Sequence, residues 1–207
     1  MQLRSNDFED GQPIPRASAF GKPGEPIALS DNRNPHLAWR DAPPGTRSFV
    51  LTCIDGDAPS RGDDVNKQGR TVSADLPRTD FVHWLMADIP AECGELAAGA
   101  CSDEVTPQGK RDPFGPPGSV QGVNDYTGWF AGDAEMGGAY LGYDGPCPPW
   151  NDSLPHHYRF QLSALDVAEL PLAQGFSLAE LRAAMAGHVL AAAELTGTYS
   201  LNPAVPA

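Results

Sequence analysis

Three apolar runs, separated by long segments rich in glycine and proline, constrain the fold of this chain more than any other feature. Residues 48–54 form a continuous apolar and β-branched run that stops at Asp55-Gly-Asp57. Residues 81–89 are apolar on both faces. Residues 158–164 alternate between apolar and polar, which is typical of a strand with one buried face. We therefore predict three strands, of which the first two are buried at the centre of a sheet.

The segments between these runs favour an antiparallel sheet over alternating strands and helices. The chain has 22 glycines and 21 prolines, but its 41% of hydrophobic residues exclude disorder. Residues 36–39 are a shorter candidate strand, and residues 1–20, 59–79 and 101–155 are predicted as long loops. One helix is predicted over residues 177–195, because Ser177 and Glu180 form a capping box and Gly197 follows the last apolar residue. We expect a single, mainly β domain over residues 1–207.

The charge balance and the cysteines exclude several classes of protein. Fourteen Lys and Arg stand against 27 Asp and Glu, a net charge of −13 at pH 7. This field repels phosphate backbones and anionic bilayers, so we expect no nucleic-acid partner and no stable membrane insertion. The N-terminus lacks the pattern of a signal peptide, which predicts a cytoplasmic protein. The four cysteines form no CxxC pair and are expected to be reduced, with a Cys93–Cys101 bridge as the alternative.

A few acidic, histidine and tyrosine residues lie at the ends of the predicted strands. Asp55 and Asp57 follow the first strand, at a spacing that puts both carboxylates on one side of an extended chain. His83 interrupts the second run, and His156 and Tyr158 share a face of the third. Together they suit a phosphate or carboxylate, or a metal held by two His and one Asp. Each also has an interpretation without a binding role: a turn at Asp55 and Asp57, a hydrogen-bonded core histidine at His83, and a solvent-exposed polar strand end at His156. Spacing in the sequence alone does not decide between these interpretations.

Five motifs of this sequence resemble the phosphatidylethanolamine-binding protein family, most closely its bacterial Raf-kinase-inhibitor-like branch. They are Asn34-Pro-His-Leu-Ala-Trp39, Asp55-Gly-Asp-Ala-Pro-Ser60, Phe81-Val-His-Trp84, Gly145-Pro-Cys-Pro-Pro149 and His156-His-Tyr-Arg-Phe160. Their order and separation also match. The resemblance implies a large antiparallel sheet packed on a smaller one, with an anion pocket at one end. It also implies that the ending, residues 187–199, belongs to a C-terminal helix.

The same resemblance implies which residues line the pocket. In the family's pattern Asp55 and Asp57 are the two acids, His83 is the histidine within a strand, and His156 is the motif histidine, followed by Tyr158. A backbone donor falls near Cys147. We expect Asp55 to accept a hydrogen bond from an amine or protonated headgroup, and His83, His156 and Tyr158 to donate to phosphate-type oxygens.

Three departures from the family's pattern bear on this pocket. Gly56 replaces a proline, Cys147 occupies a position that is often glycine, and His157 stands where arginine is usual. Because the expected donors are imidazoles, we predict that affinity for a phosphate-type anion falls from about pH 6 to about pH 8. His156→Ala should remove most of this dependence. His157→Ala should change it little, because period two turns His157 away from the face of His156.

Residues and resemblance together predict a non-enzymatic protein that binds a small anion or a phosphate-containing headgroup, without a metal or cofactor. Modulation of a partner protein such as a kinase or protease, and assembly into a homodimer, follow from the family alone, and the partner itself is unknown. The alternative is a hydrolase or phosphoryl-transfer enzyme that uses Asp55 and His83 as acid and base. Against it, the chain has no nucleophile-elbow motif and no phosphate loop.

Overall fold

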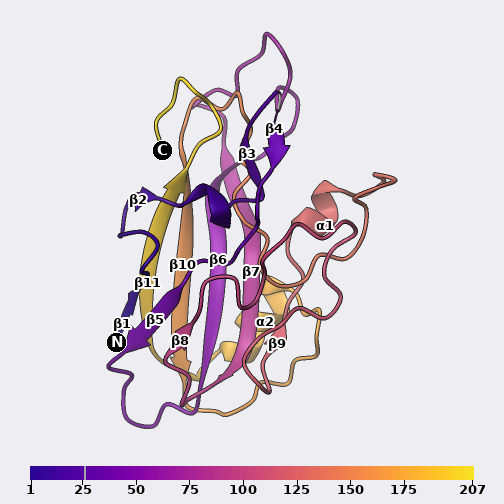
Figure 1. Cartoon of the computed structure of the whole chain (residues 1–207). Coiled ribbons are helices and arrows are strands. Elements are labelled where there is room, and N and C mark those ends of the chain that lie inside the picture. The colour runs from indigo at the N-terminus through magenta and orange to yellow at the C-terminus, as the bar shows by residue number, and fades with distance from the viewer. Residues whose placement is uncertain (26) are drawn as a thin grey trace.

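A six-stranded sheet forms the centre of the computed structural model, which describes residues 1–25 and 27–207 (Figure 1). Its strands, in spatial order, are β2 (Gln12–Pro13), β11 (Val189–Tyr199), β10 (His156–Leu165), β6 (Ser48–Pro59), β7 (Arg78–Pro90) and β9 (Val120–Gln121). All neighbours are antiparallel except β2, which runs parallel to β11. The three predicted strands are confirmed as β6, β7 and β10, which lie next to one another.

A smaller sheet packs against one face of this large sheet. It consists of β1 (Gln2–Arg4), β5 (Leu37–Arg40) and β8 (Glu95–Leu96), and a separate hairpin joins β3 (Gly21–Pro23) to β4 (Ile27–Leu29). Leu37 and Trp39 of β5 enter one apolar cluster with Trp84 and Phe160 of the large sheet. The predicted class, a large sheet packed on a smaller one, is therefore confirmed. Among the residues described, no helix combines the length and apolar character needed to cross a membrane.

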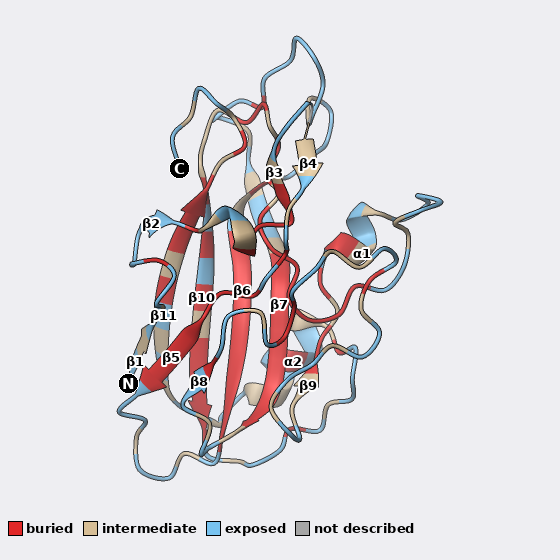
Figure 2. Ribbon diagram, in the orientation of Figure 1, coloured by how far each residue is buried: buried red, intermediate tan, exposed pale blue. Residues whose placement is uncertain are grey.

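The opposite face of the large sheet is covered by the helix α2 (Leu178–Met185) and the loop before it. Val50 and Leu85 of the sheet pack there against Leu181 of the helix and Phe176 of the loop. Because both faces are covered, β6 and β7 are buried along most of their length (Figure 2). Double burial explains why these two runs are continuously apolar in the sequence, without a period of two.

The predicted helix over residues 177–195 is right in its first half and wrong in its second. Ser177 and Glu180 form the predicted capping box, but the helix ends at Met185. Gly187 then takes a φ of +84°, and the chain returns as β11 along the edge of β10. This strand satisfies backbone groups of β10 that an open edge would leave unpaired. Gly197 lies inside β11, where a Cβ would clash with the Ile14 side chain.

The long predicted loops contain only short elements, namely η1 (Arg16–Ser18), α1 (Tyr126–Trp129) and the strands already named. The loop between β6 and β7, at the top of Figure 1, is fastened to the segment before β10 by Asn151. The Asn151 amide donates to the carbonyls of Asp64, at 2.9 Å, and Arg70, at 3.0 Å. The side-chain carbonyl oxygen of Asn151 accepts a hydrogen bond from the backbone amide of Asn66 at 3.0 Å. The loops are thus held at the end of the sheet where β6 ends and β7 and β10 begin.

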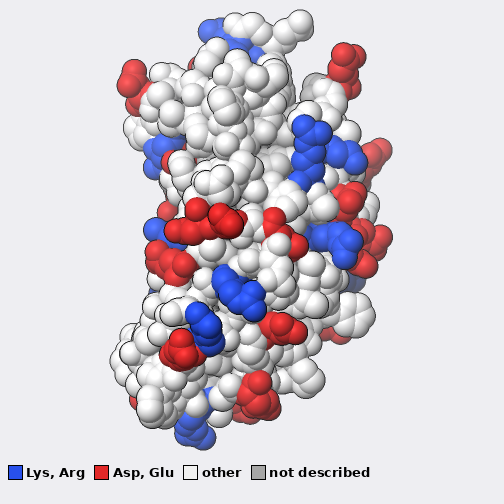
Figure 3. All heavy atoms as spheres, turned by 60° about the vertical axis from the view of Figure 1, so that its left-hand side comes forward, with Lys and Arg blue, Asp and Glu red and all other residues white. Residues whose placement is uncertain are grey.

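Charged side chains of both signs are interspersed on the face that Figure 3 shows. Exposed pairs such as Arg40–Asp41, 3.7 Å apart, contribute little to stability because water screens them. Two other pairs are largely buried: Arg78–Asp152 at 2.6 Å and Lys110–Asp144 at 2.8 Å. Both adjoin the end of the sheet to which the loops are fastened.

Candidate functional site

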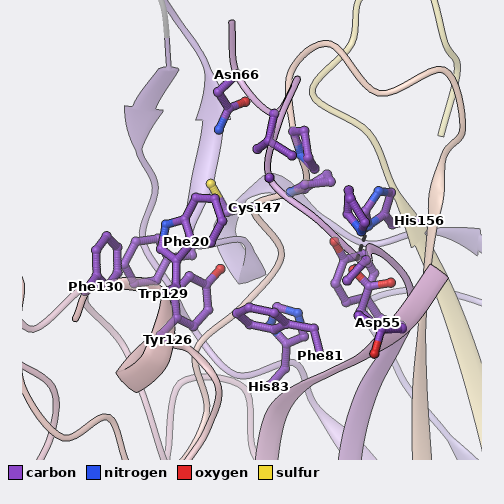
Figure 4. Close-up of a pocket in the computed structure, with 18 residues that line it drawn as sticks. Phe20, Asp55, Asn66, Phe81, His83, Tyr126, Trp129, Phe130, Cys147 and His156 are labelled. Carbon is purple, nitrogen blue, oxygen red and sulfur yellow. Dashed lines mark hydrogen bonds and ion pairs between the residues drawn. The ribbon is translucent and has the colours of Figure 1, made fainter. Parts of the chain in front are cut away.

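A cavity of about 190 Å³ opens at this end of the large sheet (Figure 4). Five of the six residues predicted from the sequence line it: Asp55, His83, Cys147, His156 and Tyr158. They come together because Asp55 of β6 lies opposite Tyr158 of β10 on one side and opposite Phe81 of β7 on the other. The sheet therefore brings strand ends that are far apart in the sequence to one wall of the cavity.

A chain of buried charges runs along this wall. The Nδ1 of His156 lies 2.6 Å from Oδ2 of Asp55, and its Nε2 lies 3.1 Å from Oδ2 of Asp152. Asp152 in turn accepts two hydrogen bonds from the Arg78 guanidinium, at 2.6 and 3.0 Å. The side chains of His156 and Asp152 are each 1% exposed, so water does not screen these interactions.

These contacts fix the charge of His156. Burial alone lowers its pKa, but the hydrogen bonds to Asp152 and Asp55 outweigh burial and raise the pKa to about 9. For Asp152, burial raises the pKa, but the hydrogen bonds from His156 and Arg78 lower it to about 2. His156 is therefore protonated near neutral pH, and both of its N–H groups already donate to carboxylates. In contrast to the sequence-based expectation, it has no free donor for a ligand, and it has no lone pair for a metal ion.

His83 is held differently. Its Nδ1 lies 2.7 Å from the carbonyl oxygen of Asp144, and because a carbonyl only accepts, this nitrogen carries the ring proton. The ring is buried against Tyr158 and Phe81, with ring centroids 5.0 Å apart in both cases. Burial lowers the pKa of His83, although Asp55 and the bond to Asp144 oppose the shift. The imidazole is thus neutral, and its Nε2 is a hydrogen-bond acceptor.

Asp144 anchors His83 from behind the cavity. Its side chain is fully buried and accepts hydrogen bonds from the amides of Asn32 and Asn124 and from the Lys110 ammonium, each at 2.8 Å. Its backbone amide also donates to the carbonyl of His83 at 3.0 Å. Three loops therefore meet at one carboxylate, which fixes the position of the His83 ring.

Two of the hydrogen-bond donors at the cavity, the Tyr158 hydroxyl and the Cys147 backbone amide, have no partner among the described residues. The Tyr158 hydroxyl is buried without one, and burial, with a contribution from Asp55, raises its pKa well above the ordinary range. The Cys147 amide also lacks one, and it is the sole N–H group of the segment 146–149, because the other three residues are prolines. Burial raises the pKa of the Cys147 thiol to about 12, so this side chain adds no charge.

Aromatic side chains from two segments, residue 20 and residues 126–130, form the wall opposite the Asp55–His156 pair (Figure 4). Phe20 stacks on Tyr126 with centroids 4.4 Å apart, and Tyr126 stacks on Phe130 at 5.8 Å. Trp129, which is 55% exposed, stands at the rim. One wall of the cavity is thus polar and the other is apolar.

Asp57 is the predicted site residue that does not line the cavity. Its amide donates to Asp55 at 2.7 Å, and its carboxylate lies 2.8 Å from Nδ1 of His157 at the surface. The register of β6 against β7 is irregular between Asp55 and Ala58, so the two carboxylates do not project to the same side. His157, 55% exposed, points away from the cavity, as its spacing from His156 predicts.

The sequence analysis missed two groups of site residues. Asp152 and Arg78 complete the buried charge chain, and the only signal for Asp152 was its place four residues before His156. The aromatic wall was missed because Phe20, Tyr126 and Phe130 come from segments that the sequence shows only as loops. Contacts between distant loops have no local pattern that would reveal them.

The charged state of His156 predicts how stability depends on pH. The pKa of His156 is raised from the ordinary 6.5 to about 9. Its contribution to the free energy of unfolding is therefore complete below about pH 6.5 and is lost as the pH rises through 9. We expect the free energy of unfolding to fall by up to about 3 kcal/mol over this range. Urea denaturation at a series of pH values measures it. His156→Gln should lose this slope and His188→Gln, at an exposed pair, should keep it. Identical slopes in all three proteins would contradict the assignment.

The comparisons with known proteins agree with this fold. The family model of the phosphatidylethanolamine-binding protein matches residues 4–200. The UPF0098 protein YbhB of Escherichia coli is 32% identical over 97% of this chain and all of its own length. The crystal structure of Escherichia coli YbcL, described as a member of the mammalian PEBP family, superposes with a TM-score of 0.69 and 30% identity. The superposition covers 96% of this chain and 97% of the YbcL chain.

A second solved structure supports the same assignment. The Chlamydia trachomatis protein CT736, described as a putative PEBP homologue, superposes with a TM-score of 0.66 and 28% identity over 96% of both chains. The sequence match spans nearly the whole chain, and the solved structures share its architecture. The chain therefore belongs to the phosphatidylethanolamine-binding protein family, among its bacterial members.

Proposed function

We propose that the cavity binds a small anion, or the phosphate-containing headgroup of an organic ligand, without chemical conversion. The observation that carries the proposal is the Tyr158 hydroxyl, which is buried at the cavity and has no hydrogen-bond partner in the described chain. A buried donor without a partner costs about 1–3 kcal/mol, and a ligand oxygen removes this cost. Family membership supports a binding function in general terms.

The rest of the cavity suits such a ligand. The free Cys147 amide is a second donor, and the aromatic wall offers apolar contact to an organic substituent. Acid–base catalysis is less well supported, because the Asp55 carboxylate is bonded to His156 and not, among the described contacts, to His83. The proposed role is therefore recognition rather than turnover.

Tyr158→Phe tests the proposal. We expect it to weaken the binding of O-phosphoethanolamine, measured by titration calorimetry near pH 5, by about tenfold or more. The same variant should not be destabilised without ligand, because it removes a buried hydroxyl that has no partner. Loss of affinity without loss of stability distinguishes a binding role from a structural one.

Tyr143→Phe is the matched control. The Tyr143 hydroxyl is equally buried but donates to the carbonyl of Ser18 at 2.6 Å, outside the cavity. This variant should lose about 1 kcal/mol of stability and keep the wild-type affinity. Failure of O-phosphoethanolamine and inorganic phosphate to bind the wild-type protein would refute the proposed function, as would unchanged affinity in Tyr158→Phe.

A further inference from the structure

We propose that the free edge of β11 is a strand-addition surface, and that the same edge of a second copy of this chain occupies it. The two β11 strands pair antiparallel about a two-fold axis at Ala193, which joins the two large sheets into one. This edge lies toward the end of the sheet opposite the cavity, where β10 ends at Leu165 (Figure 1). The proposal therefore does not depend on the ligand of the cavity.

The outer edge of β11 has backbone partners at one end only. The Thr196 amide donates to the Asp10 carboxylate at 2.8 Å, and the Thr196 carbonyl accepts from the Gly11 amide at 2.7 Å. Backbone groups of a strand point to the same edge at every second residue, so those of Glu194 and Ala192 also point outward. Neither residue has a backbone partner on that side among the described contacts. Their N–H and C=O groups are therefore open to another strand.

A bulge and the N-terminal segment set the length of the free edge. Leu190 has no residue opposite it in β10, because the register shifts between the pairs that Val189 and Ala191 form. Residues 196–198 are already bonded to residues 10–14. The regular free stretch is therefore 191–195, and Ala193 is its midpoint.

The side chains near this edge do not protect it. Natural edge strands often carry lysine or proline, which discourage pairing, but residues 189–195 contain neither. Val189 and Leu190 are large apolar side chains, yet they are 47% and 42% exposed. The first half of β11 is half-buried or exposed, unlike most of β6 and β7 (Figure 2). An apolar strand with an open edge is an association surface.

The other sheet edges of the described chain are short or covered. β9, at the opposite edge of the large sheet, has two residues, and the Gln174 side chain and the Gly175 amide bond to Gln121 there. The outer strands of the small sheet, β1 and β8, have three and two residues. Strand addition is therefore expected at β11.

A second copy fits this edge because antiparallel pairing about a two-fold axis is self-complementary. With the axis at Ala193, Ala192 lies opposite Glu194 of the second copy, and the two residues exchange N–H···O=C bonds. Glu194 is the one charged residue of β11, and its carboxylate accepts from the Gln161 side chain on β10 at 2.8 Å. The charge is thus held on the face of the sheet and not between the two strands.

Electrostatic repulsion opposes this association only weakly. The two Glu194 side chains lie on one face at a diagonal, about 7–8 Å apart in ordinary strand geometry. The net charge of −13 on each copy acts mostly over longer distances, which physiological salt screens. Glu194→Gln and added salt should each tighten the dimer severalfold. A dimer weakened by Glu194→Gln would contradict this placement of the axis.

Sedimentation equilibrium of the full chain tests the proposal. We expect the mass to rise from 22.0 kDa toward twice that value across micromolar concentrations. The amides of Ala192 and Glu194 should exchange with D₂O more slowly as the concentration rises, because pairing protects them. A constant mass of 22.0 kDa up to about 1 mM protein would overturn the proposal. A dimer in which these two amides stay unprotected would overturn it as well, because another surface would then form the interface.

Two proline variants use the alternation of backbone groups along β11. Ala192→Pro removes an outward N–H and places a ring against the second copy, so the dissociation constant of the dimer should rise at least about tenfold. Its urea midpoint at low protein concentration should stay that of the wild type. Ala193→Pro removes an N–H that bonds to β10 and should lower the urea midpoint. Unchanged dimerisation in Ala192→Pro would overturn the proposal.

A cysteine at the axis gives a test that does not depend on proline. In this pairing the two copies of residue 193 form a non-hydrogen-bonded pair, with Cα atoms about 4.5 Å apart, which a disulfide can bridge. With oxidised glutathione, the two thiols of Ala193→Cys should each lose a proton and an electron to form one S–S bond, while glutathione disulfide is reduced to two thiols.

The matched control for the cross-link is Ala179→Cys, at an exposed position on α2. On a non-reducing gel, Ala193→Cys should run as a covalent dimer and Ala179→Cys as a monomer. Equal cross-linking of the two variants, or none in Ala193→Cys, would overturn the pairing at Ala193.

Discussion

Asp152→Asn is expected to lower the free energy of unfolding by about 3–5 kcal/mol, because it leaves two buried cations without their shared carboxylate. The Arg78 side chain is 13% exposed and that of His156 is 1% exposed, so neither regains full hydration after the change. The asparagine amide has nearly the same shape, but its NH₂ group would face the donors of Arg78 or His156. Urea denaturation near pH 7 measures the loss.

The control for this variant is Asp63→Asn. Asp63 lies 3.4 Å from Arg61, but both side chains are at least 70% exposed, so the change should cost less than about 0.5 kcal/mol. The pKa of Asp152, lowered from the ordinary 3.8 to about 2, adds a second test. The contribution of the Asp152 carboxylate to the free energy of unfolding is present above about pH 4 and is lost as the pH falls through 2. The difference in the free energy of unfolding between wild type and Asp152→Asn should therefore narrow in acid. A gap that does not depend on pH would contradict the ion pair as its cause.

Asp144→Asn is expected to destabilise the protein to a similar extent, about 3–5 kcal/mol. The Asp144 carboxylate has no exposed surface and accepts from Lys110, Asn32 and Asn124. An amide in its place brings one NH₂ group against these donors and leaves the Lys110 ammonium without a counter-charge. We expect the loss in thermal and urea denaturation, together with a shift in the imidazole signals of His83, whose ring is bonded to the backbone of Asp144.

A double-mutant cycle separates the ion pair from the amide network. Lys110→Met removes the ammonium and retains much of its apolar stem, so combining it with Asp144→Asn should recover about 1–3 kcal/mol relative to the sum of the single changes. The remaining cost belongs to Asn32 and Asn124. Strictly additive effects would show that Lys110 and Asp144 are not coupled.

The large sheet could be predicted from the sequence because burial leaves a direct trace in residue type. The apolar runs within β6 and β7 and the alternation within β10 are such traces. The second half of the predicted helix failed for a related reason. Apart from Glu194, residues 189–195 are alanines or branched apolar residues, and this pattern does not tell whether they form a helix that covers a core or a strand that pairs with the edge of β10.

The candidate site was predictable where its residues lie on strands and not where they lie on loops. Asp55, His83, His156 and Tyr158 interrupt or end apolar runs, so each stands out in the sequence. Their bonding partners do not stand out, because Asp152 and Asp144 lie in irregular segments with many other acidic residues. Without these partners, the sequence indicates a free donor at His156 and a cation at His83. The roles of the two rings therefore depend on contacts that only the folded chain provides.

The pairing of β6 with β10 has a consequence for how the protein folds. Asp55 and His156 are 101 residues apart in the chain, yet their side chains bond to each other. Closing so long a loop costs conformational entropy before the contact can repay it, and topologies dominated by such contacts fold in milliseconds to seconds. The cavity wall is therefore absent from any nascent chain that ends before β10. Ligand recognition becomes possible only when the C-terminal quarter of the polypeptide has joined the sheet.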